Sequence, residues 1–311
     1  MSNALYSGWT CWLQARTGAL CLAVTTEPTT SPAETGELKP TMLALCGIGV
    51  CVLVVWIIRC IARPDRLRLE RTPGRPNNLN IAHIIFTWLP QILAGSLTYL
   101  ALNYLLTGDA TTQPAEGVMK ACIMIASAAV GMTVWLVACL AIAAWTFRHG
   151  LSRGFGLSLR HWIYDIGRAI FTFLAVLPVC IGLAILFTYI FEAMGLEIKM
   201  HPALEYLKRF SAPWKLLAVF EAVVLAPLAE EVFFRGLLQS FFRRQLGSPR
   251  IAILIASVIF AAMHTNQPQA IPALLALSLA LGYNYERTGR LTSPIIIHAI
   301  FNAVSIADQW G

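Results

Sequence analysis

Charged residues are scarce in this chain of 311 residues, where Asp, Glu, Lys and Arg make up only 13%. A soluble globular domain carries roughly 25%. The hydrophobic content of 57% and the mean hydropathy of +0.66 also argue against an ordinary soluble protein. The formal net charge of +7 comes mainly from arginines between apolar segments, which in a membrane protein act as orientation signals. We therefore expect an integral membrane protein with no nucleic-acid partner.

Paired cysteines are also missing. None of the eight cysteines belongs to a C-x-x-C pair, and most lie inside apolar segments, where cysteine behaves as a small hydrophobic residue. This argues against a disulfide framework and against a cysteine-ligated metal site. The chain contains no G-x-S-x-G and no H-E-x-x-H motif, so neither a serine-hydrolase elbow nor a zincin helix is predicted.

Long apolar runs make up most of the chain. A bilayer core about 30 Å thick needs about 20 apolar residues per helix, which predicts an all-α polytopic membrane bundle of about eight transmembrane helices. The last three are short, which suggests shielding by longer neighbours or a locally thinned membrane. The predicted spans lie near residues 41–62, 81–106, 119–147, 167–194, 215–241, 249–265, 269–286 and 293–308.

The chain divides into three parts. We expect residues 1–40 to form a flexible N-terminal tail without a convincing signal peptide, residues 41–210 to form N-terminal transmembrane helices, and residues 211–311 to form a C-terminal region that carries most of the intramembrane polar residues. Arginine-rich loops should lie on the cytoplasmic side. Arg243 and Arg244 belong to that side, and their long side chains should extend to the membrane interface.

Two adjacent carboxylates interrupt one predicted span. Placing a carboxylate in hydrocarbon costs at least about 2.5–3.5 kcal/mol on the mildest insertion scale, so Glu230 and Glu231 indicate a functional site. Residues four apart share a helix face, which predicts an ion pair between Glu231 and Arg235. Glu230 points about 100° away and has no cation in its own turn, which suits it to general acid–base catalysis. A purely structural clamp between helices is the alternative for Glu231 and Arg235.

Two histidines and an asparagine lie in equally apolar surroundings further along the chain. His264 ends an apolar run, one turn after Phe260. His298 and Asn302 are four residues apart, on one face of a short apolar helix. In a chain with an intramembrane acid pair, these groups indicate a site. Mutual hydrogen bonding between helices is the alternative.

These residues form three short patterns in order along the chain. The patterns are E-E-x-x-x-R (Glu230, Glu231, Arg235), F-x-x-x-H (Phe260, His264) and H-x-x-x-N (His298, Asn302). Together they resemble the CAAX-protease and bacteriocin-processing family, which includes the Rce1-type prenyl-protein endopeptidases and is also called the Abi family. The lead-in YERTGRLTSPIIIHAIFN is similar to that family's run of acid, Thr-Gly, Pro and His. The resemblance covers roughly residues 215–308, and the N-terminal two thirds match only in being membrane helices.

The resemblance implies an intramembrane endopeptidase. In its terms Glu230, with His264, activates a water that attacks the scissile carbonyl, while His298 and Asn302 stabilise the oxyanion. The residues that support the site would be Glu231, Arg235 and Phe260. No cofactor is expected, because Asn302 is a poor zinc ligand. A zinc-dependent protease with Glu230, His264 and His298 as metal ligands is the alternative.

The resemblance also implies where the protein acts. Its partners would be the lipid bilayer and a membrane or membrane-associated protein or peptide substrate, and it would be a multi-pass protein of the plasma (inner) membrane if the source is bacterial. A non-catalytic immunity or scaffold protein of the same family is a second possibility. A transporter would also use buried acids, but it would show paired broken helices, and no internal symmetry is evident.

Overall fold

The computed structural model describes residues 39–63, 69, 72, 74–107, 117–198 and 210–310. All regular elements among these residues are helical, and the extended backbone there is limited to an isolated β-bridge between Asn77 and Phe147. The predicted all-α class is therefore confirmed. Most of the tail predicted over residues 1–40 lies outside the described residues.

Four helical segments of the described chain are long and apolar enough to cross a membrane. Their outer faces carry large apolar side chains, and Ile61, Leu105 and Trp145 are each more than 70% exposed in the isolated chain. Contiguous apolar surface of this kind indicates contact with lipid, which makes this a membrane protein. The segments are α2 (Pro40–Ala62), α3 (Ile81–Phe86) with α4 (Trp88–Thr107), α5 (Gly117–Thr146) and α6 (Trp162–Ala193).

The C-terminal region consists of one long composite helix and three further helices. The composite helix comprises α8 (Ala212–Phe220), η3 (Glu221–Leu225), α9 (Ala226–Glu231), η4 (Val232–Gln239) and α10 (Ser240–Leu246). It is followed by α11 (Pro249–Ala262), the short turn η5 (Pro268–Ala270), α12 (Ile271–Thr288) and α13 (Thr292–Trp310). All eight predicted spans are thus helical, but α11 and α13 are shorter than a full apolar span, and α12 and the composite helix carry buried polar groups.

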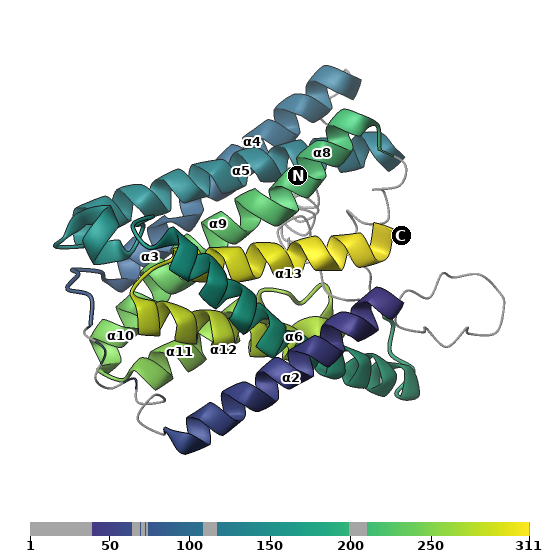
Figure 1. Cartoon of the computed structure of the whole chain (residues 1–311). Helices are drawn as coiled ribbons and strands as arrows, with labels where there is room; N and C mark the ends of the chain where they lie inside the picture. The colour runs from purple at the N-terminus through teal and green to yellow at the C-terminus, as the bar shows by residue number, and fades with distance from the viewer. Residues whose placement is uncertain are drawn as a thin grey trace.

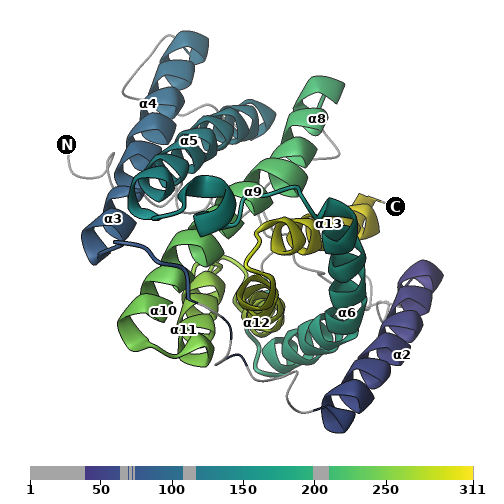
Figure 2. The same cartoon turned by 60° about the vertical axis from the view of Figure 1, so that its left-hand side comes forward.

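The helices form a bundle with α12 near its centre. Helix α12 contacts α6, α11, α13 and η4, and Figure 2 shows it enclosed by these neighbours. The α4–α5 pair packs against one side of the composite helix, and α2 packs along α6 at the opposite edge of the bundle (Figure 1). A helix placed at the centre must bury its whole circumference, and this is the setting in which buried polar groups need partners from neighbouring helices.

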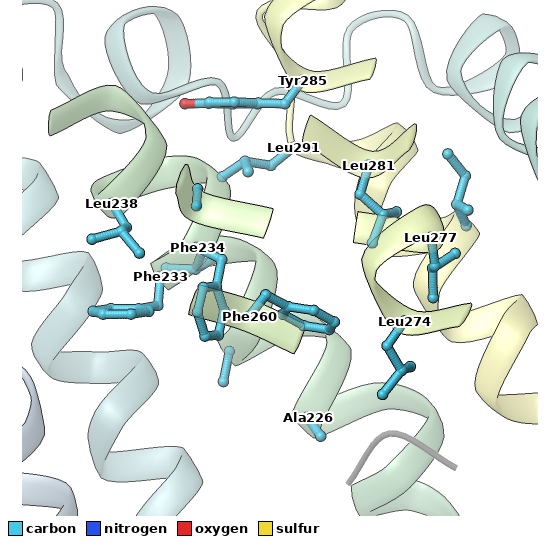
Figure 3. Packing of buried hydrophobic residues seen from close by; sticks show 14 of the residues in the cluster. Ala226, Phe233, Phe234, Leu238, Phe260, Leu274, Leu277, Leu281, Tyr285 and Leu291 are labelled. Carbon is cyan, nitrogen blue, oxygen red and sulfur yellow. The ribbon is translucent and has the colours of Figure 1, made fainter. Parts of the chain in front are cut away.

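The core around α12 is apolar and contiguous. Leu274, Leu277, Leu281 and Tyr285 recur every three or four residues, and each is fully buried (Figure 3). Three phenylalanines from η4 and α11 surround the same core: Phe233, Phe234 and Phe260. Because lipid tails are as apolar as leucine, these side chains stabilise the bundle through close packing.

A loop from the N-terminal region is built into this core. The π-helical turn η2 (Gly150–Phe155) places the Phe155 ring directly against Gly236, where any side chain would overlap it. The Tyr285 hydroxyl donates a hydrogen bond to the Phe155 carbonyl at 2.9 Å. The N-terminal and C-terminal regions therefore share one core, and residues of both regions pack against the composite helix that carries the glutamate pair.

Candidate active site

The glutamate pair lies at the end of α9, between two π-helical segments. Such segments occur frequently at functional sites. Glu231 is fully buried and Arg235 is 1% exposed. Their predicted ion pair is present, with 3.1 Å between Arg235 Nε and Glu231 Oε2. Glu230 is also buried, on the neighbouring face of the same helix.

His298 lies between the two carboxylates. Its Nδ1 is 3.0 Å from Glu231 Oε1, and its Nε2 is 3.8 Å from Glu230 Oε2. Because an ionised carboxylate can only accept a hydrogen bond, the Glu231 contact assigns a proton to His298 Nδ1. In the neutral ring Nε2 is then an acceptor that faces a second acceptor, Glu230. A proton or a water molecule between these two atoms is needed to make the contact favourable.

Arg235 and Phe260 connect this group to α11 and α12. Arg235 Nη2 donates to Ser278 Oγ at 3.1 Å, and its guanidinium carbon lies 4.9 Å from the centre of the Phe260 ring. The Phe260 ring is in turn 5.7 Å from the His298 ring and 4.8 Å from the His264 ring. Phe260 therefore separates the two histidines and supports the arginine by a cation–π contact.

His264 and Asn302 are oriented by backbone carbonyls. His264 Nδ1 lies 2.8 Å from the Phe260 carbonyl oxygen, which can only accept, so Nδ1 carries the proton and Nε2 is the acceptor side of the neutral ring. Asn302 Nδ2 donates to the Ala222 carbonyl of η3 at 2.8 Å. Both side chains are at least 96% buried, since His264 is 4% exposed and Asn302 is 0% exposed.

The predicted site residues therefore gather at one place in the bundle, although they come from α9, η4, α11 and α13. The described contacts join Glu230, Glu231, Arg235, Phe260 and His298 directly. His264 joins through Phe260, and Asn302 lies one turn beyond His298 on α13.

The donors do not form a closed metal site. Within the described part of the chain, no three His, Cys, Asp or Glu side chains are grouped so that they could hold a metal ion. The Glu231 carboxylate already binds a cation, the Arg235 guanidinium. We therefore derive no step through a metal.

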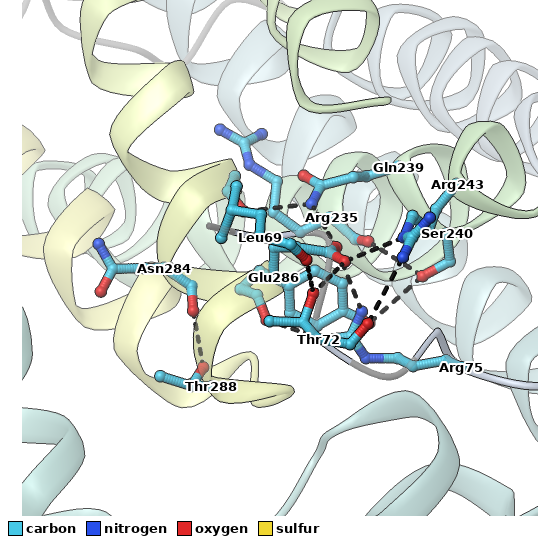
Figure 4. Close-up of polar contacts among 12 residues, drawn as sticks. Leu69, Thr72, Arg75, Arg235, Gln239, Ser240, Arg243, Asn284, Glu286 and Thr288 are labelled. Carbon is cyan, nitrogen blue, oxygen red and sulfur yellow. Dashed lines mark hydrogen bonds and ion pairs between the residues drawn. The ribbon is translucent and has the colours of Figure 1, made fainter. Parts of the chain in front are cut away.

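Sequence reasoning missed a second polar cluster on the same helices, centred on Glu286 (Figure 4). Arg243 Nε lies 3.2 Å from Glu286 Oε1, and Arg244 Nη1 donates to the Leu79 carbonyl at 2.7 Å. Both arginines were expected to extend to the membrane interface; the structure adds that Arg243 pairs with Glu286 and that the exposed Arg244 binds the Leu79 carbonyl. The signal that could have found the cluster is the four-residue spacing of Ser278, Gly282 and Glu286 on α12.

The C-terminal region is similar to known proteins. Residues 212–304 match a family model described as type II CAAX prenyl endopeptidase Rce1-like. The chain is 35% identical over 81 residues to the UPF0177 protein in the abiGi 5′ region of Lactococcus lactis subsp. cremoris, which covers 26% of this chain and 33% of that protein. It is 37% identical over 84 residues to the uncharacterized protein YpbD of Bacillus subtilis, which covers 26% of this chain and 40% of YpbD.

A third relative is an uncharacterized 24.3 kDa protein of Escherichia coli, 31% identical over 91 residues, which is 28% of this chain and 42% of that protein. The chain thus spans between 33% and 42% of the length of these relatives. No solved structure matches it.

Proposed function

We propose that this protein is a membrane-embedded endopeptidase, because residues 212–304 match the family model of type II CAAX prenyl endopeptidase Rce1-like proteins. The observation that carries the proposal is the buried carboxylate of Glu230 at 3.8 Å from His298 Nε2, with the other ring nitrogen bound to Glu231. A buried carboxylate beside a histidine that a second carboxylate orients is an arrangement suited to general acid–base catalysis. Such a pair is suited to hold and polarise a water molecule.

In the proposed reaction the water lies between Glu230 and His298. One water can lie at about 2.8 Å from both atoms, because their separation is 3.8 Å. The water donates a proton to Glu230 while the water oxygen attacks the scissile carbonyl carbon. The C–N bond then breaks, and the same proton passes from Glu230 to the leaving amine. We assign His264 to this water as the acceptor that replaces His298 when His298 Nε2 carries a proton, because the proton of His264 lies on Nδ1 and its Nε2 can accept.

Asn302, together with His298 when its Nε2 also carries a proton, would stabilise the oxyanion of the tetrahedral intermediate. Both side chains are 0% exposed, and donors in a dry, preorganised site stabilise developing charge best. The Ala222 carbonyl orients the Asn302 amide, and the Glu231 carboxylate orients the His298 ring. Glu231 thus has two partners, because Arg235 binds its other oxygen.

We propose a multi-pass arrangement in the plasma (inner) membrane if the source is bacterial, with a membrane or membrane-associated protein or peptide as substrate. The four long apolar helical segments support a membrane location, and a peptide bond must enter the bundle to reach the buried Glu230. We also propose that no metal cofactor is needed, because a glutamate-activated water supplies the nucleophile.

The test is a cleavage assay with purified protein in liposomes that contain membrane proteins of the source cell. New protein termini are counted by mass spectrometry for the wild type, Glu230→Gln and His264→Ala. Glu192→Gln is the matched control, because Glu192 is exposed at the end of α6. We expect new termini from the wild type and the control, and none from the two site variants. If folded Glu230→Gln and His264→Ala produced the wild-type set of termini, the protease proposal would be wrong, and an absence of cleavage by the wild type would favour the non-catalytic scaffold.

A further inference from the structure

Two neighbouring helices carry polar groups at matching four-residue intervals. On the composite helix these are Arg235 and Gln239 in η4 and Arg243 in α10, and they face Ser278, Gly282 and Glu286 on α12. Arg235 Nη2 donates to Ser278 Oγ at 3.1 Å, and Gln239 Nε2 donates to the Gly282 carbonyl at 3.1 Å. Arg243 Nε donates to Glu286 Oε1 at 3.2 Å. We call these three contacts the polar ladder.

Glu286 ends the polar ladder and is the one acidic residue in it. Its side chain is 1% exposed, and Gln239 Nε2 also reaches its Oε2 at 3.4 Å. Two further contacts come from the segment before α3: Thr72 Oγ1 donates to Oε1 at 3.1 Å, and Arg75 Nη1 lies 3.9 Å from Oε2 (Figure 4). The carboxylate is thus compensated by two arginines from different parts of the chain. A buried charge with this many partners is costly to disturb.

The ladder determines how the two helices align along their length. Successive contacts are four residues apart, which is about 6 Å along a helix. If the composite helix slid by one turn, Arg235 would face Gly282 instead of the Ser278 hydroxyl, and a cation would be lost opposite Glu286. The apolar side chains between the helices add close packing, whereas each polar contact also requires a particular partner at a particular position. The polar contacts therefore specify the alignment.

The same alignment places the proposed active site. Glu231 lies four residues before Arg235 on the composite helix, and α12 leads through a short turn at Gly289 into α13, which carries His298. The distance of 3.0 Å between Glu231 Oε1 and His298 Nδ1 therefore depends on how the composite helix is placed relative to α12 and α13. Glu286 is about 18 Å from Glu231 along the helix axis, as twelve residues separate Arg243 from Glu231.

We propose that Glu286 is a positioning residue for the catalytic group, and that the segment containing Thr72 and Arg75 completes its binding site. Glu286 touches neither water nor substrate. It acts by holding the composite helix in register with α12, so that Glu230 and Glu231 meet His298. This inference rests on the proposed protease function only for its kinetic test, and its structural test is independent of cleavage.

The experiment compares wild type, Glu286→Gln, the double variant Glu286→Gln with Arg243→Gln, and the exposed control Glu192→Gln. The rate of cleavage per folded molecule is measured at several concentrations of a substrate found in the assay above. We expect Glu286→Gln to lower kcat about 10- to 100-fold with KM changed less than about twofold, because a misplacement of about 1 Å is enough for such a loss. The double variant should recover part of kcat, since it removes one of the two uncompensated cations.

Hydrogen–deuterium exchange provides the second measurement, on protein without substrate. Glu286→Gln should speed exchange in peptides that contain Glu231 and in peptides that contain His298, and the Glu192→Gln control should not. If Glu286→Gln kept wild-type kcat per folded molecule, or left both peptides unchanged, the positioning role would be wrong. If the wild type cleaved nothing, the protease proposal would fail by itself, and the exchange data would still decide whether Glu286 holds the two helices together.

Discussion

Replacing Arg235 by methionine removes the cation that neutralises Glu231 while it keeps a long side chain in the same space. Arg235 is 1% exposed and Glu231 is 0% exposed, so water cannot replace the lost partner. Two unit charges at the observed 3.1 Å attract each other by about 5 kcal/mol at an effective dielectric constant of about 20. Measured losses on breaking a buried pair are about 3–5 kcal/mol, because one charge stays buried without compensation.

We therefore expect Arg235→Met to lower the free energy of unfolding by about 3–5 kcal/mol. His298 will limit the loss if it takes up a proton, since its Nδ1 stays 3.0 Å from the same carboxylate. The double variant Arg235→Met with Glu231→Gln removes both charges. It should recover most of the stability, because a neutral buried pair of similar volume is often as stable as an ion pair.

Unfolding by denaturant in detergent micelles, followed by circular dichroism, measures these differences. Arg153→Met is the control, because Arg153 is exposed on η2 and its replacement should change stability little. Wild-type stability in Arg235→Met would refute the reasoning. A double variant that is no more stable than Arg235→Met would also refute it, because the loss would then come from packing and not from the unpaired charge.

Four further predictions concern other parts of the molecule. Asn302→Ala should lower kcat about 10²–10³-fold with little change in KM, as measured by initial rates, because it removes an oxyanion donor. Treatment with a metal chelator should leave the cleavage rate unchanged, and a loss reversed by added zinc would refute the metal-free proposal. Gly236→Ala should cost about 1–3 kcal/mol in denaturant unfolding, because a Cβ would overlap the Phe155 ring. Arg290→Gln should destabilise more than Asp165→Asn in the same assay, because Asp165 is 0% exposed and Arg290 is 20% exposed, so only the arginine retains water when its partner is lost.

Local features of the fold were predictable from the sequence. The span predicted over residues 41–62 is α2 (Pro40–Ala62), and the span predicted over 293–308 lies within α13 (Thr292–Trp310). The pair of Glu231 and Arg235 is equally local, because residues four apart meet on any helix of ordinary geometry.

Contacts between distant parts of the chain were not predictable in the same way. The sequence indicated that His298 belongs to a site, but its partner Glu231 is 67 residues away. Arg243 was expected at the membrane interface from its position after an apolar span, but its ion pair with Glu286 on α12, 43 residues away, was not predicted. A buried carboxylate attracts any cation within reach, and which cations are within reach depends on how the helices pack.

The sequence by itself determined that this is an all-α membrane protein, which segments are helical, and which residues interrupt the apolar runs with groups suited to catalysis. These properties follow from the composition of each segment and the period of one helix. The tertiary structure alone decided that Glu230 and Glu231 share His298, that Phe260 separates the two histidines, and that Glu286 binds Arg243 of the neighbouring helix. Each of these contacts joins helices far apart in the chain, and their relative placement is set by the packing of the entire bundle around α12.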